Sequence, residues 1–236
     1  MRDDDGREIV LQACGLSAGY GDLPAIRRID VHIARGEIVA LFGANGAGKT
    51  TTLMSLVGEL PRSAGQAHWL GRPTQARLHQ LARQGLAFVP EYRSVLASMS
   101  VRDNLLLGRG GVEAAVEIFP ELGPLLGRRA GLLSGGEQQM LTLARALAAR
   151  PVALLVDELS LGLAPIVVER LFTVLRQAVR SHDIAVLLVE QEARRALDVA
   201  DRWYLLRNGE LVGCGDANGG IDQLEREYLA GLSSAD

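Results

Sequence analysis

The stretch that decides the fold is GANGAGKT, which spans residues 43–50. It fits G-x-x-x-x-G-K-[ST], a pattern in which a glycine-rich turn wraps phosphate groups with its backbone N–H groups. An apolar run at 38–42 precedes the turn and a predicted helix at 49–57 follows it, so the turn ends at a helix N-terminus, which favours an anion. The residues expected to bind nucleotide phosphates are Gly43, Asn45, Gly46, Ala47, Gly48, Lys49, Thr50 and Thr51.

Lysine is almost absent from this chain, and its single use falls inside that stretch. Of the 25 basic residues, 24 are arginine and one, Lys49, is lysine. A position that keeps lysine against this bias indicates a need for a compact ammonium group. We therefore expect Lys49 to reach the β- and γ-phosphates of ATP and to serve catalysis, and the Thr50 hydroxyl to bind Mg²⁺.

Two adjacent carboxylates follow a second apolar run. The run at 152–156 reads VALLV and leads into Asp157 and Glu158. Ligands of parallel sheets gather at the carboxyl ends of the strands, so we expect both acids to face the phosphate loop. Asp157 suits the Mg²⁺ shell, and Glu158 suits the polarisation of an attacking water. The alternative is a solvated acidic turn, and the phosphate loop argues against it.

A second glycine-rich stretch, LSGGEQ at 133–138, opens a predicted helix. Ser134 and Glu137 fit a capping box, which would explain both residues structurally. A capping box does not explain Gly135 and Gly136, which cost helix stability but let a backbone approach an anion closely. We therefore expect these four residues to form a second phosphate-contacting surface.

Short apolar runs alternate with helical segments along the chain, which predicts a parallel α/β core. Polar and apolar residues alternate at 29–33, as in a half-buried strand, and Asn208-Gly209 predicts a tight hairpin. Further strands are predicted at 38–42, 86–89, 152–156 and 184–189, and helices at 49–57, 74–84, 137–149, 165–179 and 192–200.

The chain is predicted to form a single domain with an inserted lobe. The core comprises 1–91 and 134–220, and a small helical subdomain occupies about 92–133. A C-terminal helix is expected at about 221–232.

The three motifs, in this order, resemble the ABC ATPase family, in which a phosphate loop, an LSGGE signature and a strand ending in Asp-Glu recur. The resemblance covers essentially the whole chain. It implies a P-loop NTPase core with a mixed sheet, an N-terminal antiparallel β subdomain and the inserted helical subdomain. It also implies that two cassettes meet head to tail, so that Ser134 and Gly136 contact the partner's ATP. Tyr20 matches the aromatic residue that stacks on adenine, with a core or loop tyrosine as the alternative.

Two departures from the family's usual motifs are informative. Glu91 stands where most cassettes have glutamine, and Gln191 stands where most have histidine. Together with SLGLAP at 160–165, they resemble the second ATPase of branched-chain amino-acid importers, although Leu159 would usually be proline there. On this resemblance we expect Glu91 near Mg²⁺. Gln191 is expected to touch the γ-phosphate as a neutral donor, because an amide does not ionise near neutral pH.

The resemblance further implies that the cassette powers integral-membrane permease subunits, which it contacts through a groove between core and lobe. Tyr92, Val95, Leu96 and Met99 cluster along the border of that groove. A solvated loop would not need four such residues so close together, so we expect Tyr92 or Leu96 to dock a membrane subunit. The alternative is that two or three of them pack into the lobe.

Composition and charge narrow the function further. The formal net charge of −3 gives no electrostatic argument for a nucleic-acid partner. The apolar runs are too short to cross a bilayer and the first residues do not resemble a signal peptide, so we expect a cytoplasmic protein, peripheral on the inner face of the membrane. Cys14 and Cys214 are predicted to be separate reduced thiols.

Three other functions stand against this hypothesis. One is a soluble ABC ATPase of an assembly or repair complex, as in iron–sulfur cluster assembly, although that class typically keeps the histidine that Gln191 replaces. Another is an importer ATPase for a different small polar solute, such as urea or an amide. A degenerate, non-hydrolysing module is the third, and Lys49, Asp157 and Glu158 argue against it.

Overall fold

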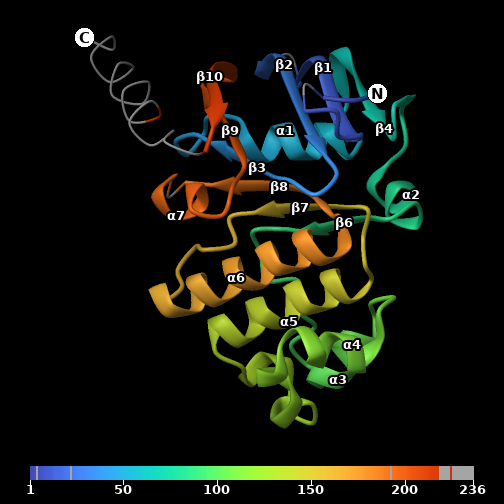
Figure 1. Cartoon of the computed structure of the whole chain (residues 1–236), viewed down its shortest axis with the longest axis vertical. Coiled ribbons are helices and arrows are strands. Elements are labelled where there is room, and N and C mark those ends of the chain that lie inside the picture. The colour runs from blue at the N-terminus through green and yellow to red at the C-terminus, as the bar shows by residue number, and fades with distance from the viewer. Residues whose placement is uncertain (4, 22, 192, 218–223, 225–236) are drawn as a thin grey trace.

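The chain folds into two sheets, and helices cover both faces of the larger one (Figure 1). The computed structural model describes residues 1–3, 5–21, 23–191, 193–217 and 224. A four-stranded antiparallel sheet has the order β2-β1-β4-β5, and a six-stranded sheet has the order β10-β9-β3-β8-β7-β6. In the larger sheet β10 pairs antiparallel with β9, and the other pairs are parallel. The strands are β1 (Ile9–Tyr20), β2 (Leu23–Ala34), β3 (Ile38–Phe42), β4 (Arg62–Trp69), β5 (Arg72–Thr74), β6 (Leu86–Val89), β7 (Ala153–Asp157), β8 (Ala185–Glu190), β9 (Arg202–Arg207) and β10 (Glu210–Asp216).

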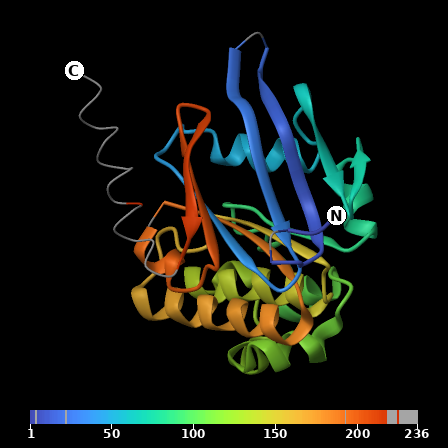
Figure 2. The same ribbon diagram turned by 45° about the horizontal axis from the view of Figure 1, so that its top comes forward.

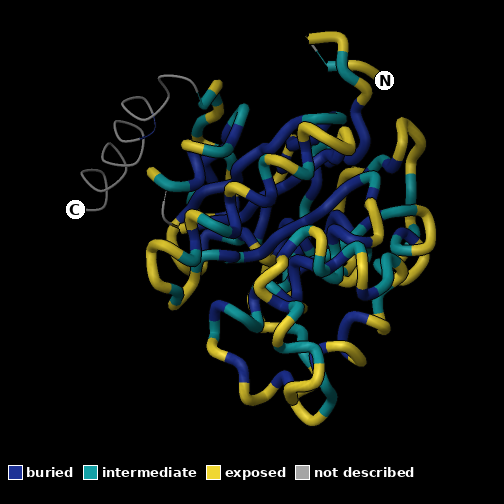
Figure 3. Tube along the Cα trace, turned by 60° about the horizontal axis from the view of Figure 1, so that its bottom comes forward, coloured by how far each residue is buried: buried dark blue, intermediate teal, exposed yellow. Residues whose placement is uncertain are grey.

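The two faces of the larger sheet carry different helices because side chains alternate along each strand. On β3, Ile38, Ala40 and Phe42 share a core with α5 and α6, whereas Val39 and Leu41 share one with α1 and the smaller sheet. Figure 2 shows the same layering, and Figure 3 shows that buried residues gather in the middle of the molecule and exposed ones at its periphery. The helices are α1 (Lys49–Leu56), α2 (Leu78–Arg83), α3 (Val101–Leu106), α4 (Gly111–Ile118), α5 (Gly135–Ala148), α6 (Pro165–His182) and α7 (Ala193–Leu197), with 3₁₀ turns at Pro120–Leu125 and Ala130–Leu132.

The segment at 92–133 is short-helical and packs against α5. Ser100 caps α3, because its hydroxyl oxygen accepts a hydrogen bond from the Asp103 N–H at 3.0 Å. Phe119 and Leu122, near the 3₁₀ turn, are fully buried in the same core as α5. The apolar residues of this segment therefore attach it to the helical face of the core.

One sequence-based expectation needs correction, and another is confirmed. The predicted helix at 74–84 is wrong at its start, because Arg72–Thr74 pairs with β4 as a strand. Arg77 then caps the helix, and its backbone N–H donates to Gln80 Oε1 at 2.9 Å. Cys14 is a free thiol as expected, but its Sγ lies 3.8 Å from His68 Nδ1 across the β1–β4 pair.

The C-terminal helix predicted at 221–232 lies outside the described residues, apart from Leu224. That side chain is buried in the core that α5 and α6 share. Among the described residues, no helix combines the length and hydropathy that a bilayer crossing requires.

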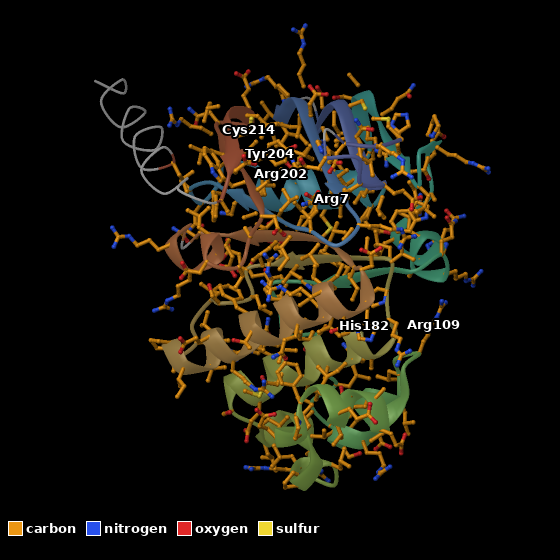
Figure 4. The ribbon with its side chains drawn as sticks, viewed as in Figure 1. Arg7, Arg109, His182, Arg202, Tyr204 and Cys214 are labelled. Atoms are coloured by element: carbon orange, nitrogen blue, oxygen red, sulfur yellow. The ribbon has the colours of Figure 1, made fainter. Side chains whose placement is uncertain are left out.

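A buried carboxylate joins the residue before β3 to β9 and to the segment before β1. Glu37 is fully buried, and its oxygens accept hydrogen bonds from Arg202 at 2.8 and 3.1 Å and from Arg7 at 3.4 Å. Arg202 and Tyr204 lie next to each other on β9, with Arg7 on the same side of the molecule (Figure 4). Paired charges of this kind are costly to break one partner at a time, so this network fixes β9 against the start of β3.

Candidate nucleotide-binding site

The phosphate loop runs from β3 into α1 and packs tightly against its neighbours. Gly48 has a φ of 106°, and a Cβ there would lie 2.6 Å from Ile26 Cγ2. A Cβ at Gly43 would lie 2.6 Å from the carbonyl oxygen of Leu206. Both positions therefore require glycine. Because α1 begins at Lys49, its unpaired N-terminal N–H groups lie at the end of the loop, where they can bind an anion.

Lys49 is held inside this loop. Its side chain is only 5% exposed, and Nζ donates hydrogen bonds to the carbonyl oxygens of Gly43 at 2.9 Å and Ala44 at 3.3 Å. Nζ also lies 3.3 Å from Glu158 Oε1. The single lysine of the chain is thus a buried cation that contacts the loop and the carboxylate predicted to be catalytic.

Asp157 and Thr50 meet at the carboxyl end of β7. The Thr50 hydroxyl donates to Asp157 Oδ2 at 3.0 Å. Burial raises the pKa of Asp157 to about 6; the Thr50 hydrogen bond opposes that rise, and the nearby charges of Glu158 and Glu91 add to it. Its second oxygen, Oδ1, is buried without a hydrogen-bond partner among the described residues. A hydroxyl beside an unpartnered buried carboxylate oxygen is a donor set that fits Mg²⁺, which prefers hard oxygen ligands.

Glu158 adopts an uncommon backbone conformation at this edge of the sheet. Its backbone φ is 49°, in the left-handed region that residues other than glycine rarely adopt. The Glu158 N–H donates to the carbonyl oxygen of Val189 on β8 at 2.9 Å. Strain held by surrounding structure is common at functional sites, so this bend, which places the carboxylate beside Lys49, supports a chemical role.

Glu190 is a site residue to which the sequence analysis gave no role. Its side chain is nearly inaccessible, at 2% exposed, and it ends the strand next to β7. Oε1 and Oε2 accept hydrogen bonds from the Ser160 N–H at 3.0 Å and the Ser160 hydroxyl at 2.7 Å. Through these two hydrogen bonds, Glu190 holds the turn that follows Glu158 in place. The signal in the sequence was a charged residue ending an otherwise apolar run, directly before Gln191.

The LSGGE stretch forms the capping box that the sequence predicts. The Ser134 N–H donates to Glu137 Oε2 at 2.6 Å, and the Glu137 N–H donates to Ser134 Oγ at 3.3 Å. Gly136 also meets a packing demand, since a Cβ there would lie 2.9 Å from Val167, whereas a Cβ at Gly135 would meet only the guanidinium of the exposed Arg93 side chain, which can move. Helix α5 and helix α1 cover opposite faces of the sheet, so these residues are remote from their own phosphate loop (Figures 1 and 2).

Tyr20, Glu91 and Gln191 lie on the surface around this cluster, and Thr50 within the cluster is exposed as well. Tyr20 ends β1 with 62% of its area exposed. Glu91 is exposed after β6, near enough to Asp157 for its charge to affect that pKa. Gln191 is exposed directly after β8. The structure thus gathers Lys49, Thr50, Asp157 and Glu158 into one cluster, and it leaves Tyr20, Glu91 and Gln191 outside that cluster.

Comparison with known proteins agrees with this geometry. The ABC transporter family model matches residues 26–160. The branched-chain amino acid transport ATP-binding protein BraG of Pseudomonas aeruginosa is 40% identical over 211 residues, which are 84% of this chain and 88% of that protein. The probable branched-chain amino acid transport ATP-binding protein LivF of Archaeoglobus fulgidus is 34% identical over 233 residues, or 94% of this chain and 98% of that one.

A solved structure has the same fold. The nucleotide-free ATP-binding cassette of an ABC transporter superposes with a TM-score of 0.84 at 22% identity, over 92% of this chain and 95% of that chain. The family match and the two relatives cover most of the sequence, including the phosphate loop and the strand that ends in Asp157. The chain therefore belongs to the ABC transporter family, of which it is an ATP-hydrolysing cassette subunit.

Proposed function

We propose that this cassette drives the import of branched-chain or related amino acids through membrane subunits carried on other chains. The observation that carries the cargo assignment is the likeness to BraG and LivF over more than four fifths of the chain. The non-standard Glu91 and Gln191, together with SLGLAP at 160–165, add to it. The cassette would sit at the cytoplasmic face of the membrane, attached to its permease subunits.

The cluster of Lys49, Thr50, Asp157 and Glu158 supplies the groups for ATP hydrolysis. Lys49 exchanges its contact with Glu158 for the β- and γ-phosphate oxygens, and Glu158, once released, accepts the proton of the attacking water. Thr50 and Asp157 would hold Mg²⁺, with Glu91 nearby. When bound there, the metal would supply positive charge that neutralises phosphate oxygens. Gln191 offers a neutral N–H donor at the same edge of the sheet.

A second cassette completes the nucleotide site in this proposal. Ser134, Gly135, Gly136 and Glu137 lie at the N-terminus of α5, on the far face of the sheet from their own phosphate loop. A head-to-tail partner, either an identical copy or a paralogue, would bring the same residues to this chain's ATP. Tyr20, exposed at the end of β1, would stack on the adenine.

The groove between core and lobe suits a membrane subunit. Residues from α2, β6, α5 and the loop after α3 line a hollow of about 470 Å³ with mostly apolar walls. Tyr92 is 82% exposed and Leu96 is 49% exposed, whereas Val95 packs against the core and Met99 is half-buried. Exposed apolar side chains beside an apolar groove favour a protein partner. Tyr92 and Leu96 are therefore the proposed docking residues.

Amino-acid uptake tests the cargo. In cells that lack this chain and any redundant importer, uptake of leucine, isoleucine and valine should be lost and should return with the parental gene but not with Glu158→Gln. Uptake of an unrelated solute is the control. Normal uptake of all three amino acids in the deleted cells would overturn the cargo assignment while leaving the ATPase assignment intact.

A further inference from the structure

A three-way junction of backbone lies beside the phosphate loop. It joins the start of β2, the loop itself and the turn Asn208-Gly209 between β9 and β10. Figures 1 and 2 show the β9–β10 hairpin standing beside β2, far from the loop in sequence but adjacent in space. The Gly209 N–H donates to the carbonyl oxygen of Ala47 at 3.0 Å, and the Arg27 N–H donates to the carbonyl oxygen of Gly209 at 2.7 Å.

The junction leaves no space for a side chain. A Cβ at Gly209 would lie 2.4 Å from the carbonyl oxygen of Ala25, and one at Gly48 would lie 3.0 Å from the same atom. A Cβ at Gly43 would lie 2.6 Å from the carbonyl oxygen of Leu206, on the strand that leads into the turn. Backbone therefore packs directly on backbone in all three segments, so the turn has little freedom to move relative to the loop.

The hydrogen bond from Gly209 fixes the direction of one peptide in the loop. The described chain contains no cis peptide bonds, so the Ala47 carbonyl and the Gly48 N–H point in opposite directions across one planar unit. Holding the carbonyl toward Gly209 turns the Gly48 N–H away from the turn. If this peptide rotated, its carbonyl oxygen would take the place of a donor and would repel phosphate oxygens.

We propose that Gly209 is a positioning residue for nucleotide binding, which holds the Ala47–Gly48 peptide so that it presents an N–H group to the phosphates. The inference rests on the proposed role of the phosphate loop and adds a residue that lies outside the loop and signature motifs. The turn also contacts the strand that follows Tyr20, so Gly209 holds the phosphate-binding and adenine-binding sides of the site in register.

The chain offers a matched control for this role. Leu70-Gly71, between β4 and β5, forms a turn with φ values of 50° and 75°, and Asn208-Gly209 has 49° and 80°. At Gly71 the nearest atom to a Cβ is 3.5 Å away, so alanine there meets the same backbone strain without the clash. Comparing Gly209→Ala with Gly71→Ala separates the contact with the loop from the cost of alanine in a left-handed turn.

The test is the dissociation constant for ADP, with thermal unfolding measured alongside. Gly209→Ala should weaken ADP binding by about tenfold or more, the scale of losing one well-placed hydrogen bond to a charged group. Gly71→Ala should stay within about twofold of the parent. Equal affinities for parent and both variants would overturn the role of Gly209. If the parent itself fails to bind ADP, the phosphate-loop assignment falls and this inference falls with it.

A second measurement needs no variant and applies if Gly209→Ala does not fold. Amide hydrogen exchange of the parental protein should slow at Gly209 when ADP binds, because ordering the loop stabilises the bond to the Ala47 carbonyl. Exchange at Gly71 should not change. An ADP-bound parent whose Gly209 amide exchanges as fast as in the free protein would contradict the proposal.

Discussion

At the scale of single residues, the lysine and the glutamate of the cluster neutralise each other until a nucleotide arrives. Lys49 Nζ lies 3.3 Å from Glu158 Oε1, and both side chains are largely shielded from water. A buried ammonium needs an anion nearby, and a carboxylate oxygen that contacts it is not free to contact an attacking water. Phosphate oxygens can replace Glu158 as the partner of Lys49, so nucleotide binding and release of the base are one event.

Glu158→Gln tests this exchange. Loss of the base should lower the rate of phosphate release by ~10²-fold or more. ATP affinity should hold or improve, because Lys49 no longer has a competing carboxylate. Steady-state hydrolysis and nucleotide binding measure the two effects, and Glu121→Gln, which changes a partly exposed carboxylate paired with Arg170, is the control. A hydrolysis rate within a few-fold of the parent would remove Glu158 from the catalytic role.

Local sequence was sufficient to find the residues of the phosphate loop and the two acids after β7, because each motif fixes its own geometry. Glu190 was not found. Its partner Ser160 is 30 residues away, and only the folded sheet brings the end of β8 to the turn after β7. A charged residue at the end of an apolar run marks Glu190 as unusual, but local spacing does not identify the distant turn that it binds.

At the scale of elements, strands were predicted well where both faces are buried. Continuous apolar runs such as those of β3 and β8 can form little else. Strand β4 was missed, because RSAGQAHW is exposed over its first half and takes its conformation from pairing with β1. Helix α2 begins later than predicted for the same reason, since Thr74 is paired with Ala67 before the helix starts.

The two hydrogen bonds that Ser160, in the turn after β7, donates to Glu190 on β8 should support the rate of ATP turnover. Glu190→Gln keeps the shape of the side chain but removes its charge. Its NH₂ group can still donate to the Ser160 hydroxyl, so two charge-assisted hydrogen bonds are replaced by weaker neutral ones. Loosening the turn should lower kcat about tenfold while KM for ATP changes less than about threefold, because positioning of Glu158 is impaired and phosphate binding is not.

A double-mutant cycle distinguishes this from general destabilisation. Ser160→Ala should lower kcat similarly, and the pair Glu190→Gln with Ser160→Ala should lose little more than either alone. If the loss of kcat in the double variant equals the product of the losses in the two single variants, Glu190 and Ser160 act separately.

Asp201 joins three elements and gives the fold a pH dependence. Its carboxylate accepts hydrogen bonds from Arg176 on α6 at 2.7 and 2.8 Å and from the Ile38 N–H on β3 at 2.8 Å. Burial alone would raise the pKa of Asp201, but these hydrogen bonds lower it below its ordinary value. A lowered pKa means that this stabilisation is complete above about pH 4 and is lost as the pH falls through the folded-state value.

Asp201→Asn should therefore lower the free energy of unfolding at pH 7 by about 1–3 kcal/mol. The difference in the free energy of unfolding between this variant and the parent should become smaller below about pH 4, where the parental carboxyl becomes protonated. Urea unfolding at several pH values measures both effects. Asp198→Asn, an exposed position just before it, should have little effect. A difference in the free energy of unfolding that grows as the pH falls would contradict the stabilising role of the ionised Asp201 carboxylate.

At the scale of the whole molecule, the two faces of the large sheet carry different functional motifs. One face carries α1 and the smaller sheet, whereas the other carries α5, α6 and the segment at 92–133. The phosphate loop and the LSGGE stretch therefore face different surroundings, and the proposed head-to-tail partner joins them. The sequence could predict this only through family resemblance, because no local pattern states which helix covers which face.

The proposed docking surface can be tested without touching the nucleotide site. Tyr92→Asp combined with Leu96→Asp should leave the cassette folded and able to bind ATP, because both side chains are exposed. Co-purification with the membrane subunits should be abolished, since two carboxylates would have to be buried against an apolar partner. Val212→Asp, at an exposed apolar residue on β10 and therefore outside the segment at 92–133, is the control. Parental yield of the complex from the double variant would refute the docking claim.

The most direct test of the central claim uses the single lysine. An amine-labelling reagent can react only at Lys49 and at the N-terminal amine, which serves as an internal control. If Lys49 binds the phosphates, saturating ATP with Mg²⁺ should slow labelling of Lys49 and leave labelling of the N-terminus unchanged. A labelling rate at Lys49 that saturating ATP does not alter would contradict the assignment of the phosphate loop, and with it the account of this cassette.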